Sequence, residues 1–65
     1  MHITNAMKLE ELRRELRKRH DVYPRLVRED RLSPEVAALR VMILERIIED
    51  YERALKGSVQ EGLAL

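Results

Sequence analysis

The sequence predicts an all-α fold, an antiparallel hairpin of two helices over residues 5–29 and 34–56 that pairs with a second copy into a homodimeric four-helix bundle. Apolar residues recur at helical spacing, and few residues interrupt them: Pro24, Pro34, Gly57 and Gly62. The composition, 38% charged and 3% aromatic, is typical of long solvated helices. The second helix also carries more apolar surface than one partner helix can cover, which favours assembly.

The first helix is expected to begin near Asn5 or Ala6, because Thr4 or Asn5 can accept a hydrogen bond from a free N–H of its first turn. Its apolar residues form one narrow row: Leu9, Leu12, Leu16, Tyr23 and Val27, with Leu26 alongside. His20 falls in the same row. We expect it to pack in the core, where it can hydrogen-bond to a tyrosine across the hairpin.

Pro24 interrupts the hydrogen bonding of this helix, since it removes the N–H that would bond to the carbonyl of His20. The helix must either kink near residues 20–23 or break, with Pro24 opening a short second helix. We favour the kink, because the apolar row continues in phase from Leu16 through Tyr23 to Val27.

The start of the second helix is the clearest local signal. Ser33 is a good N-cap, Pro34 suits the first turn and Glu35 lies at the positive end of the helix. The helix is expected to end near Lys56, with Gly57 turning left-handed past its end and residues 57–65 forming a flexible tail. Its polar side offers opposite charges four residues apart: Arg46/Asp50, Glu49/Arg53 and Glu52/Lys56.

Two apolar stripes run along the second helix. The first faces helix one when the chain folds at residues 30–33, and it contains Ala37, Val41, Leu44, Ile48, Tyr51 and Leu55. The second lies about 100° away and has no partner in the hairpin. The predicted interface with a second copy is therefore Val36, Leu39, Arg40, Ile43, Ile47 and Ala54. Arg40, inside this apolar arc, is expected to reach solvent or to meet Asp50 or Glu29 of the second copy.

Size and composition exclude several classes of protein. A chain of 65 residues without cysteine has a small core and no disulfide, so self-association is the remaining source of stability. His2 and His20 are too few and too far apart for a metal site, and we expect no cofactor, no small-molecule substrate and no enzymatic activity. The chain has neither a membrane span nor a signal peptide, which predicts a cytoplasmic protein.

A basic face on the first helix is the main alternative functional feature. Residues 1–31 hold nine Lys/Arg and six Asp/Glu, and five of the cations project away from the apolar row: Arg14, Arg17, Lys18, Arg25 and Arg28. Such a face could contact phosphates of RNA or DNA. Glu10 and Asp21 on the same face, the scarcity of aromatic residues and a pI near 8.2 favour an ordinary solvated face instead.

Several segments together resemble a family of short helical proteins of bacterial and phage genomes that has no established activity. The most specific pieces are Val22-Tyr23-Pro24-Arg25 and Ile47-Ile48-Glu49-Asp50-Tyr51, with Glu11-Leu12-Arg13-Arg14-Glu15-Leu16, Val27, Leu32-Ser33 and residues 42–45 in the same order. The chain departs from the family at Asp21, where a basic residue is expected, and at residues 29–31, where the family usually has a glycine. The resemblance implies a compact accessory protein of phage origin.

The matching region begins after Met7, which offers an alternative start and would make residues 1–6 an upstream extension. The function we expect is a non-enzymatic, self-associating module for protein interaction or regulation. The alternative is a dimer that binds RNA or DNA through the basic face.

Overall fold

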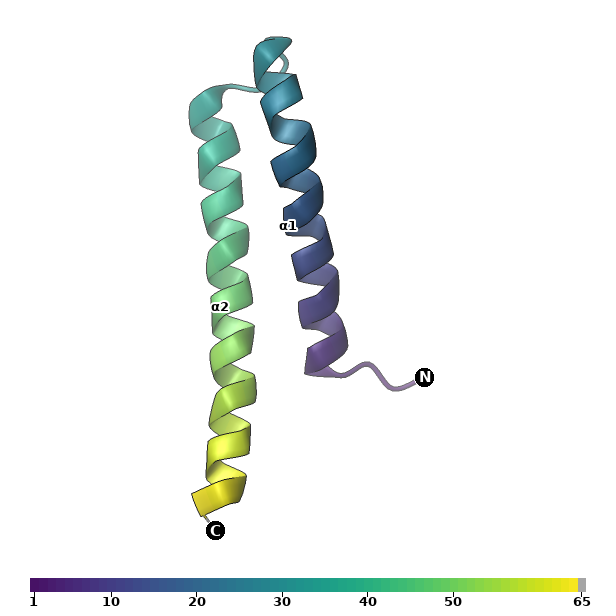
Figure 1. The fold of residues 1–65 in the computed structure, drawn as a ribbon, viewed down its shortest axis with the longest axis vertical. Coiled ribbons are helices and arrows are strands. Elements are labelled where there is room, and N and C mark those ends of the chain that lie inside the picture. Colours follow the sequence, from purple (N-terminus) through teal and green to yellow (C-terminus); the bar gives the residue numbers. More distant parts are fainter. Residues whose placement is uncertain (65) are drawn as a thin grey trace.

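The computed structural model describes residues 1–57 with their side chains and the helical backbone of residues 58–64. It contains two helices, α1 (Asn5–Arg28) and α2 (Pro34–Ala64), which run antiparallel and pack side by side (Figure 1). The described residues include no strand, so the predicted all-α hairpin is confirmed. Neither helix has a described segment long and apolar enough to cross a membrane.

Thr4 is the N-cap of α1. Its Oγ1 accepts a 3.1 Å hydrogen bond from the backbone N–H of Met7, and its carbonyl accepts the first helical bond from Lys8. The bond to Oγ1 satisfies the N–H of Met7, which has no backbone partner within the helix. Of the two caps that the sequence allows, the structure selects Thr4, and the helix begins at Asn5 as predicted.

Helix α1 continues through Pro24 without a break, and Figure 1 shows it as one rod. The alternative in which Pro24 opens a separate helix is therefore wrong. Pro24 and His20 are both exposed, so solvent can reach the turn where the helical bond to the carbonyl of His20 is missing. This exposure explains how the helix tolerates a proline in its interior.

The turn after α1 has the hydrogen bonds of a Schellman motif. The N–H of Arg31 donates to the carbonyl of Leu26 at 2.9 Å, and the N–H of Asp30 donates to the carbonyl of Val27 at 3.1 Å. Asp30 has a φ of 60°, the left-handed conformation that this motif requires and that glycine adopts most easily. The chain thus reverses direction through an aspartate at a position that favours glycine.

Ser33 caps α2 as predicted, since its Oγ accepts a 3.1 Å bond from the N–H of Val36 and its carbonyl accepts from Ala37. The predicted end of this helix at Lys56 is wrong, because α2 runs on to Ala64. Gly57 does not adopt a positive φ, and a glycine inside a helix costs only about 1 kcal/mol relative to alanine. The sequence also predicts that residues 58–65 are flexible, and the side chains of these residues lie outside the described part of the structure.

The core lies along the seam between the helices. Leu9, Leu44 and Ile48 form its buried centre, and Ala37 is buried nearer the turn. Partly buried residues from both helices pack against the centre: Leu12, Leu16, Tyr51 and Leu55. The stripe of α2 predicted to face helix one does so, but few of the described apolar side chains are fully enclosed.

One position of the α1 row differs from the prediction. His20 is exposed, and the half-buried residue between Leu16 and Tyr23 is Arg19. At 100° per residue, residues 19 and 20 lie about 60° and 40° to either side of Leu16, so the helical repeat permits either on the seam, and the packing of the helices places Arg19 there. The expected core histidine is therefore wrong, and a cation takes its place.

Charged residues link the helices differently from the expected pairs along α2. Glu52 accepts a 2.7 Å bond from Arg13 of α1 rather than pairing with Lys56, and Asp50 pairs with Arg53 rather than with Arg46. The Arg13–Glu52 pair lies on the seam near its open end. All four of these paired side chains are well exposed, so each pair contributes little to stability.

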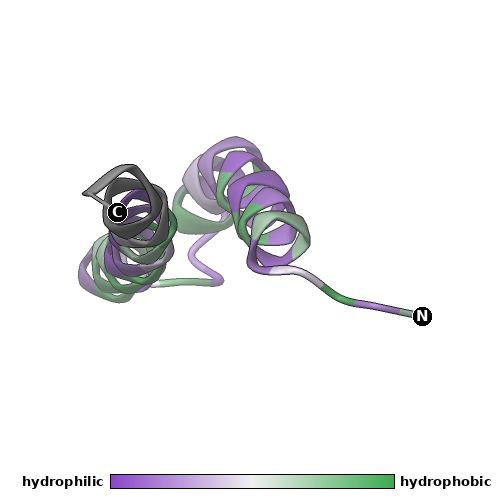
Figure 2. Ribbon diagram, turned by 90° about the horizontal axis from the view of Figure 1, so that it is seen from below, coloured by the Kyte–Doolittle hydropathy of each residue, from purple (hydrophilic) through white to green (hydrophobic). Residues whose placement is uncertain are grey.

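The hairpin is slender. It measures 54 × 26 × 13 Å, and its radius of gyration of 15.6 Å exceeds the value of about 11 Å expected for a compact domain of this length. Viewed along the long axis, α1 is mostly hydrophilic on its outer side (Figure 2), whereas apolar residues of α2 such as Leu39 and Ile43 are about half exposed. The apolar surface of α2 is therefore only partly covered by α1.

Candidate interaction surfaces

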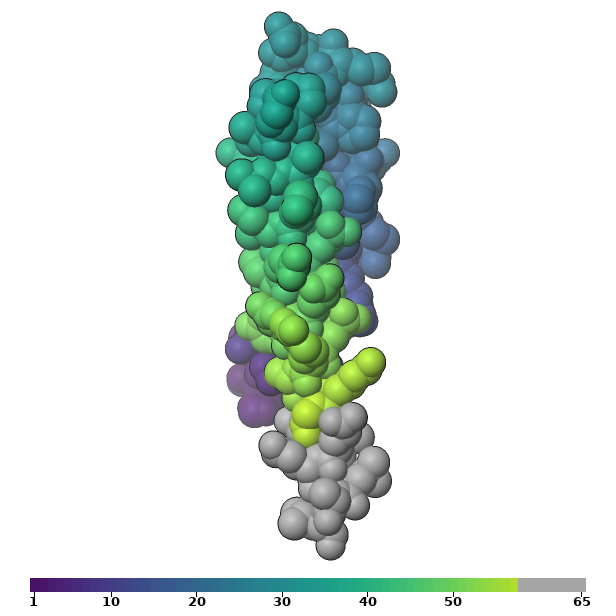
Figure 3. Space-filling view, turned by 90° about the vertical axis from the view of Figure 1, so that its left-hand side faces the viewer, coloured from purple at the N-terminus to yellow at the C-terminus, as the bar shows by residue number. Residues whose placement is uncertain are grey.

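The second apolar stripe of α2 lies open to solvent. Leu39 is 55% exposed, Ile43 50%, and Val36 and Ile47 38% each, whereas Leu44 on the seam is 4% exposed. Arg40 and Ala54 are exposed as well. We call residues 36, 39, 40, 43, 47 and 54 the α2 flank. Viewed from the side of α2, the described part of this helix lies in front of α1 (Figure 3).

One end of the α2 flank continues into a groove of about 680 Å³ between the two helices. Ile47 and Tyr51 line it from α2, Met7 and Leu12 line it from α1, and Ile3 lines it from the segment before α1. Ile3 is 60% exposed and Met7 45% exposed. The sequence predicts uncovered apolar surface on α2 alone, and the structure adds Ile3, Met7 and Leu12 to that surface.

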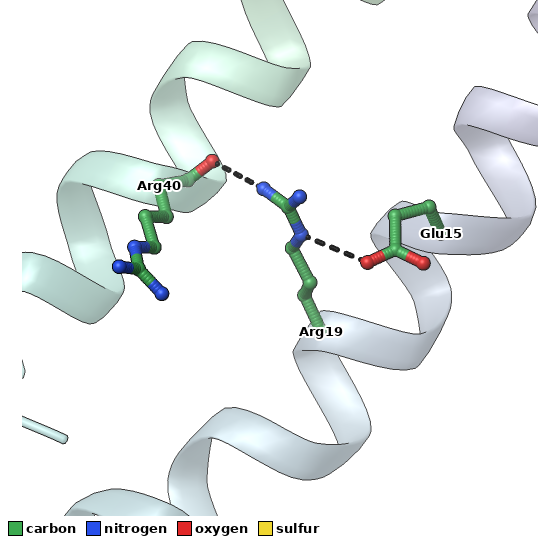
Figure 4. Close-up of polar contacts among 3 residues, drawn as sticks. All are labelled: Glu15, Arg19 and Arg40. Carbon is green, nitrogen blue, oxygen red and sulfur yellow. Dashed lines mark hydrogen bonds and ion pairs between the residues drawn. The ribbon is translucent and has the colours of Figure 1, made fainter.

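Arg19 lies at the edge of the α2 flank and joins the helices (Figure 4). Its Nη1 donates a 3.0 Å hydrogen bond to the backbone carbonyl of Arg40, and its Nε donates to Oε1 of Glu15 at 3.2 Å. The guanidinium carbon also lies 6.0 Å from the centre of the Tyr23 ring. The guanidinium of Arg19 thus has its polar and aromatic contacts within the hairpin.

The side chain of Arg40 points away from Arg19 and is exposed (Figure 4). Among the described residues, none of the ion pairs involves Arg40. Within one hairpin, this cation therefore reaches solvent from the middle of an apolar stripe.

The predicted basic face of α1 is brought together by the unbroken helix. Arg14, Arg17, Lys18, Arg25 and Arg28 are all exposed. Arg14 is partly neutralised, because it pairs with Glu11 at 3.2 Å and approaches Glu10 at 3.9 Å. The other four cations make no ion pair with any described residue.

A second groove, of about 600 Å³, opens near the turn. Its floor is apolar and includes Val27 of α1 and Val41 of α2, and Arg28 and His20 lie at its margin. Val41 and Ile47 lie three residues on either side of Leu44, which places them about 60° to either side of the seam. This groove and the α2 flank therefore open on opposite faces of the hairpin.

The polar side chains that line the grooves do not form a metal-binding cluster among the described residues. Among the described residues, no three His, Asp or Glu side chains gather closely enough to hold a metal ion, and no polar side-chain atom is buried without a partner. The polar groups that line the grooves belong to arginine, lysine, glutamate, tyrosine and histidine side chains, most of them exposed. Each groove is an apolar surface with charged side chains beside it.

No family model, curated protein or solved structure matches the chain. The proposed function therefore rests on the residues and geometry of the chain.

Proposed function

We propose that the chain is a small, non-enzymatic helical protein that self-associates through the α2 flank into a homodimeric four-helix bundle and serves as a module for protein interaction. The observation that carries the proposal is the exposure of Leu39 and Ile43, about half in each case, beside the buried Leu44. Contiguous apolar surface of this kind marks interaction sites on soluble proteins.

The total surface supports the same conclusion. The chain exposes 5527 Å², whereas a compact monomer of 7.7 kDa exposes about 4,300 Å². The difference, about 1,200 Å², exceeds the roughly 800 Å² that each partner buries in a standard interface. Burial of the α2 flank would also supply the stability that so small a core lacks.

Substitution of the flank tests the proposal. We expect Ile43→Glu combined with Ile47→Glu to abolish the dimer, because each carboxylate would be placed in an apolar interface. The matched control is Glu45→Ala with Glu49→Ala, which changes two exposed residues of the same helix outside the flank. Sedimentation velocity at micromolar concentration should give monomer for the first variant and dimer for the second. A dimer that survives the first variant would place the interface elsewhere.

The second candidate function is binding of RNA or DNA through the basic face. It is favoured by Arg17, Lys18, Arg25 and Arg28, which share one exposed side of an unbroken helix and form no ion pair with described residues. Two such faces in a dimer would double the positive field. In this candidate the contacts are to phosphates, because side chains for stacking on bases are scarce.

Salt dependence separates this candidate from a merely solvated face. Binding to mixed single-stranded RNA and to duplex DNA should weaken as salt rises, and Arg17→Ala with Arg25→Ala should reduce the salt slope by about two. Arg46→Ala with Arg53→Ala, both on α2, is the matched control. Absence of binding at about 50 mM salt, or binding without a salt slope, would remove this candidate.

A further inference from the structure

We propose that the α2 helices of two copies pair antiparallel, centred on the level of residue 45, with Arg40 of each copy bound to Asp50 of the other. This inference rests on the proposed self-association, and it specifies which residues meet. In this arrangement Arg40, the exposed cation of the α2 flank, is the group that selects the orientation of the second copy.

The spacing of residues along α2 favours an antiparallel pair. Residues 36, 40, 43, 47, 50 and 54 follow one another in steps of four, three, four, three and four, so they share one side of the helix. This row is palindromic about residue 45. In an antiparallel pair centred there, position 36 faces position 54, position 40 faces position 50, and position 43 faces position 47.

The chemistry of the facing pairs is complementary. Val36 would meet Ala54 and Ile43 would meet Ile47, so apolar residues pack on apolar residues. The one basic residue of the row, Arg40, would meet its one acidic residue, Asp50, twice in each dimer. These two ion pairs flank the central isoleucines on both sides.

A parallel pairing of the same row would be unfavourable. It would place Arg40 against Arg40 of the second copy and Asp50 against Asp50 of the second copy, so two like-charge contacts would replace two ion pairs. The charges therefore favour the antiparallel arrangement over the parallel one, the role best established for charged groups in apolar interfaces.

Asp50 is available for this contact. Within the hairpin it pairs with Arg53, three residues along, and both side chains are largely exposed, 65% and 74% respectively. Such a surface pair is weak enough to exchange for a partner in a less exposed interface. Glu29, the other candidate partner of Arg40, caps the end of α1 and lies near Arg31 at 3.9 Å, outside the α2 row.

Charge exchange tests the inference directly. Arg40→Glu would place carboxylate against carboxylate at both sites, and Asp50→Arg would place guanidinium against guanidinium, so each variant alone should dimerise at least about tenfold more weakly. A mixture of the two variants restores both opposite-charge pairs in the heterodimer. The double variant, carrying both substitutions in one chain, restores both pairs in its homodimer.

The expected result is weak self-association of each single variant, with dimer affinity recovered to within about threefold of the original in the mixture and in the double variant. Arg46→Glu and Glu49→Arg, which carry the same changes of net charge at exposed positions outside the row, are the control pair and should leave affinity unchanged, alone or mixed. Circular dichroism of the mixture and of the double variant shows whether helical structure returns with the dimer.

The outcomes separate this inference from the proposed function. A monomeric parent protein would overturn both. A dimeric parent whose single variants dimerise normally, or whose mixture and double variant remain weak, would overturn the antiparallel Arg40–Asp50 pairing and leave self-association standing.

Discussion

The guanidinium of Arg19 on α1 binds the backbone carbonyl of Arg40 on α2 at 3.0 Å. Since the same guanidinium binds Glu15 at 3.2 Å, one side chain joins two turns of α1 to the middle of α2. The contact lies beside the α2 flank, so Arg19 holds in place the segment of backbone that carries Arg40.

Removal of the Arg19 side chain should destabilise the hairpin. We expect Arg19→Ala to lower the free energy of unfolding by about 1 kcal/mol, because a charge-assisted bond to a backbone carbonyl and packing over Tyr23 are both lost. Urea unfolding followed by circular dichroism measures this, with all variants at one protein concentration because the proposed dimerisation would add to apparent stability.

Arg17→Ala is the control for this prediction, since Arg17 is exposed and makes no ion pair with a described residue. Its effect should stay within about 0.5 kcal/mol. Equal effects of the two substitutions would show that the bond from Arg19 to α2 contributes nothing to stability.

Glycine at position 30 should stabilise the turn. Asp30 adopts a φ of 60°, which costs an L-residue free energy that glycine does not incur. We expect Asp30→Gly to raise the midpoint of thermal unfolding, with a gain of about 0.5–1 kcal/mol. Asp30→Ala, which removes the charge but keeps the Cβ, should give no such gain; equal gains would assign the effect to charge.

Alanine at position 24 should also stabilise α1. Pro24 is exposed and interrupts a continuous helix, so its replacement restores a hydrogen bond at little loss of packing. We expect Pro24→Ala to raise the free energy of unfolding by about 1–3 kcal/mol.

Pro34→Ala is the matched control, because Pro34 occupies the first turn of α2, where proline is favourable. Urea unfolding should show no gain for it. A loss of stability in Pro24→Ala would mean that the proline contributes shape or packing that its exposure does not reveal.

The features predicted best from the sequence depend on local chemistry. Thr4 and Ser33 begin the helices because their hydroxyls accept from free N–H groups, a signal complete within four residues. The α2 flank was likewise predictable, since a helix whose apolar arc is wider than one neighbour can cover must leave residues such as Ile43 exposed.

The features missed depend on competition between weak local signals and the packing of the whole helix. Gly57 resembles a helix terminator, yet without a following proline the helix continues at a cost of about 1 kcal/mol. His20 is predicted for the seam because it continues the apolar row one turn before Pro24. The helical repeat permits either residue on the seam, and the packing of the two helices places Arg19 there, where a long arginine extends its charged end to a carbonyl.

The contribution of Ile3, Met7 and Leu12 to the uncovered surface could not be derived from periodicity along α2. These residues reach the α2 flank only through the way the two helices pack. The same holds for the link between Arg13 and Glu52, which are far apart in the sequence and meet across the seam.

The oligomeric state in solution tests the central claim most directly. Sedimentation equilibrium at micromolar concentration should give a mass of about 15 kDa, twice the 7.7 kDa of one chain, with dissociation on dilution. A stable, fully helical species of 7.7 kDa across this range would contradict the account, because the α2 flank would then be exposed in the functional protein.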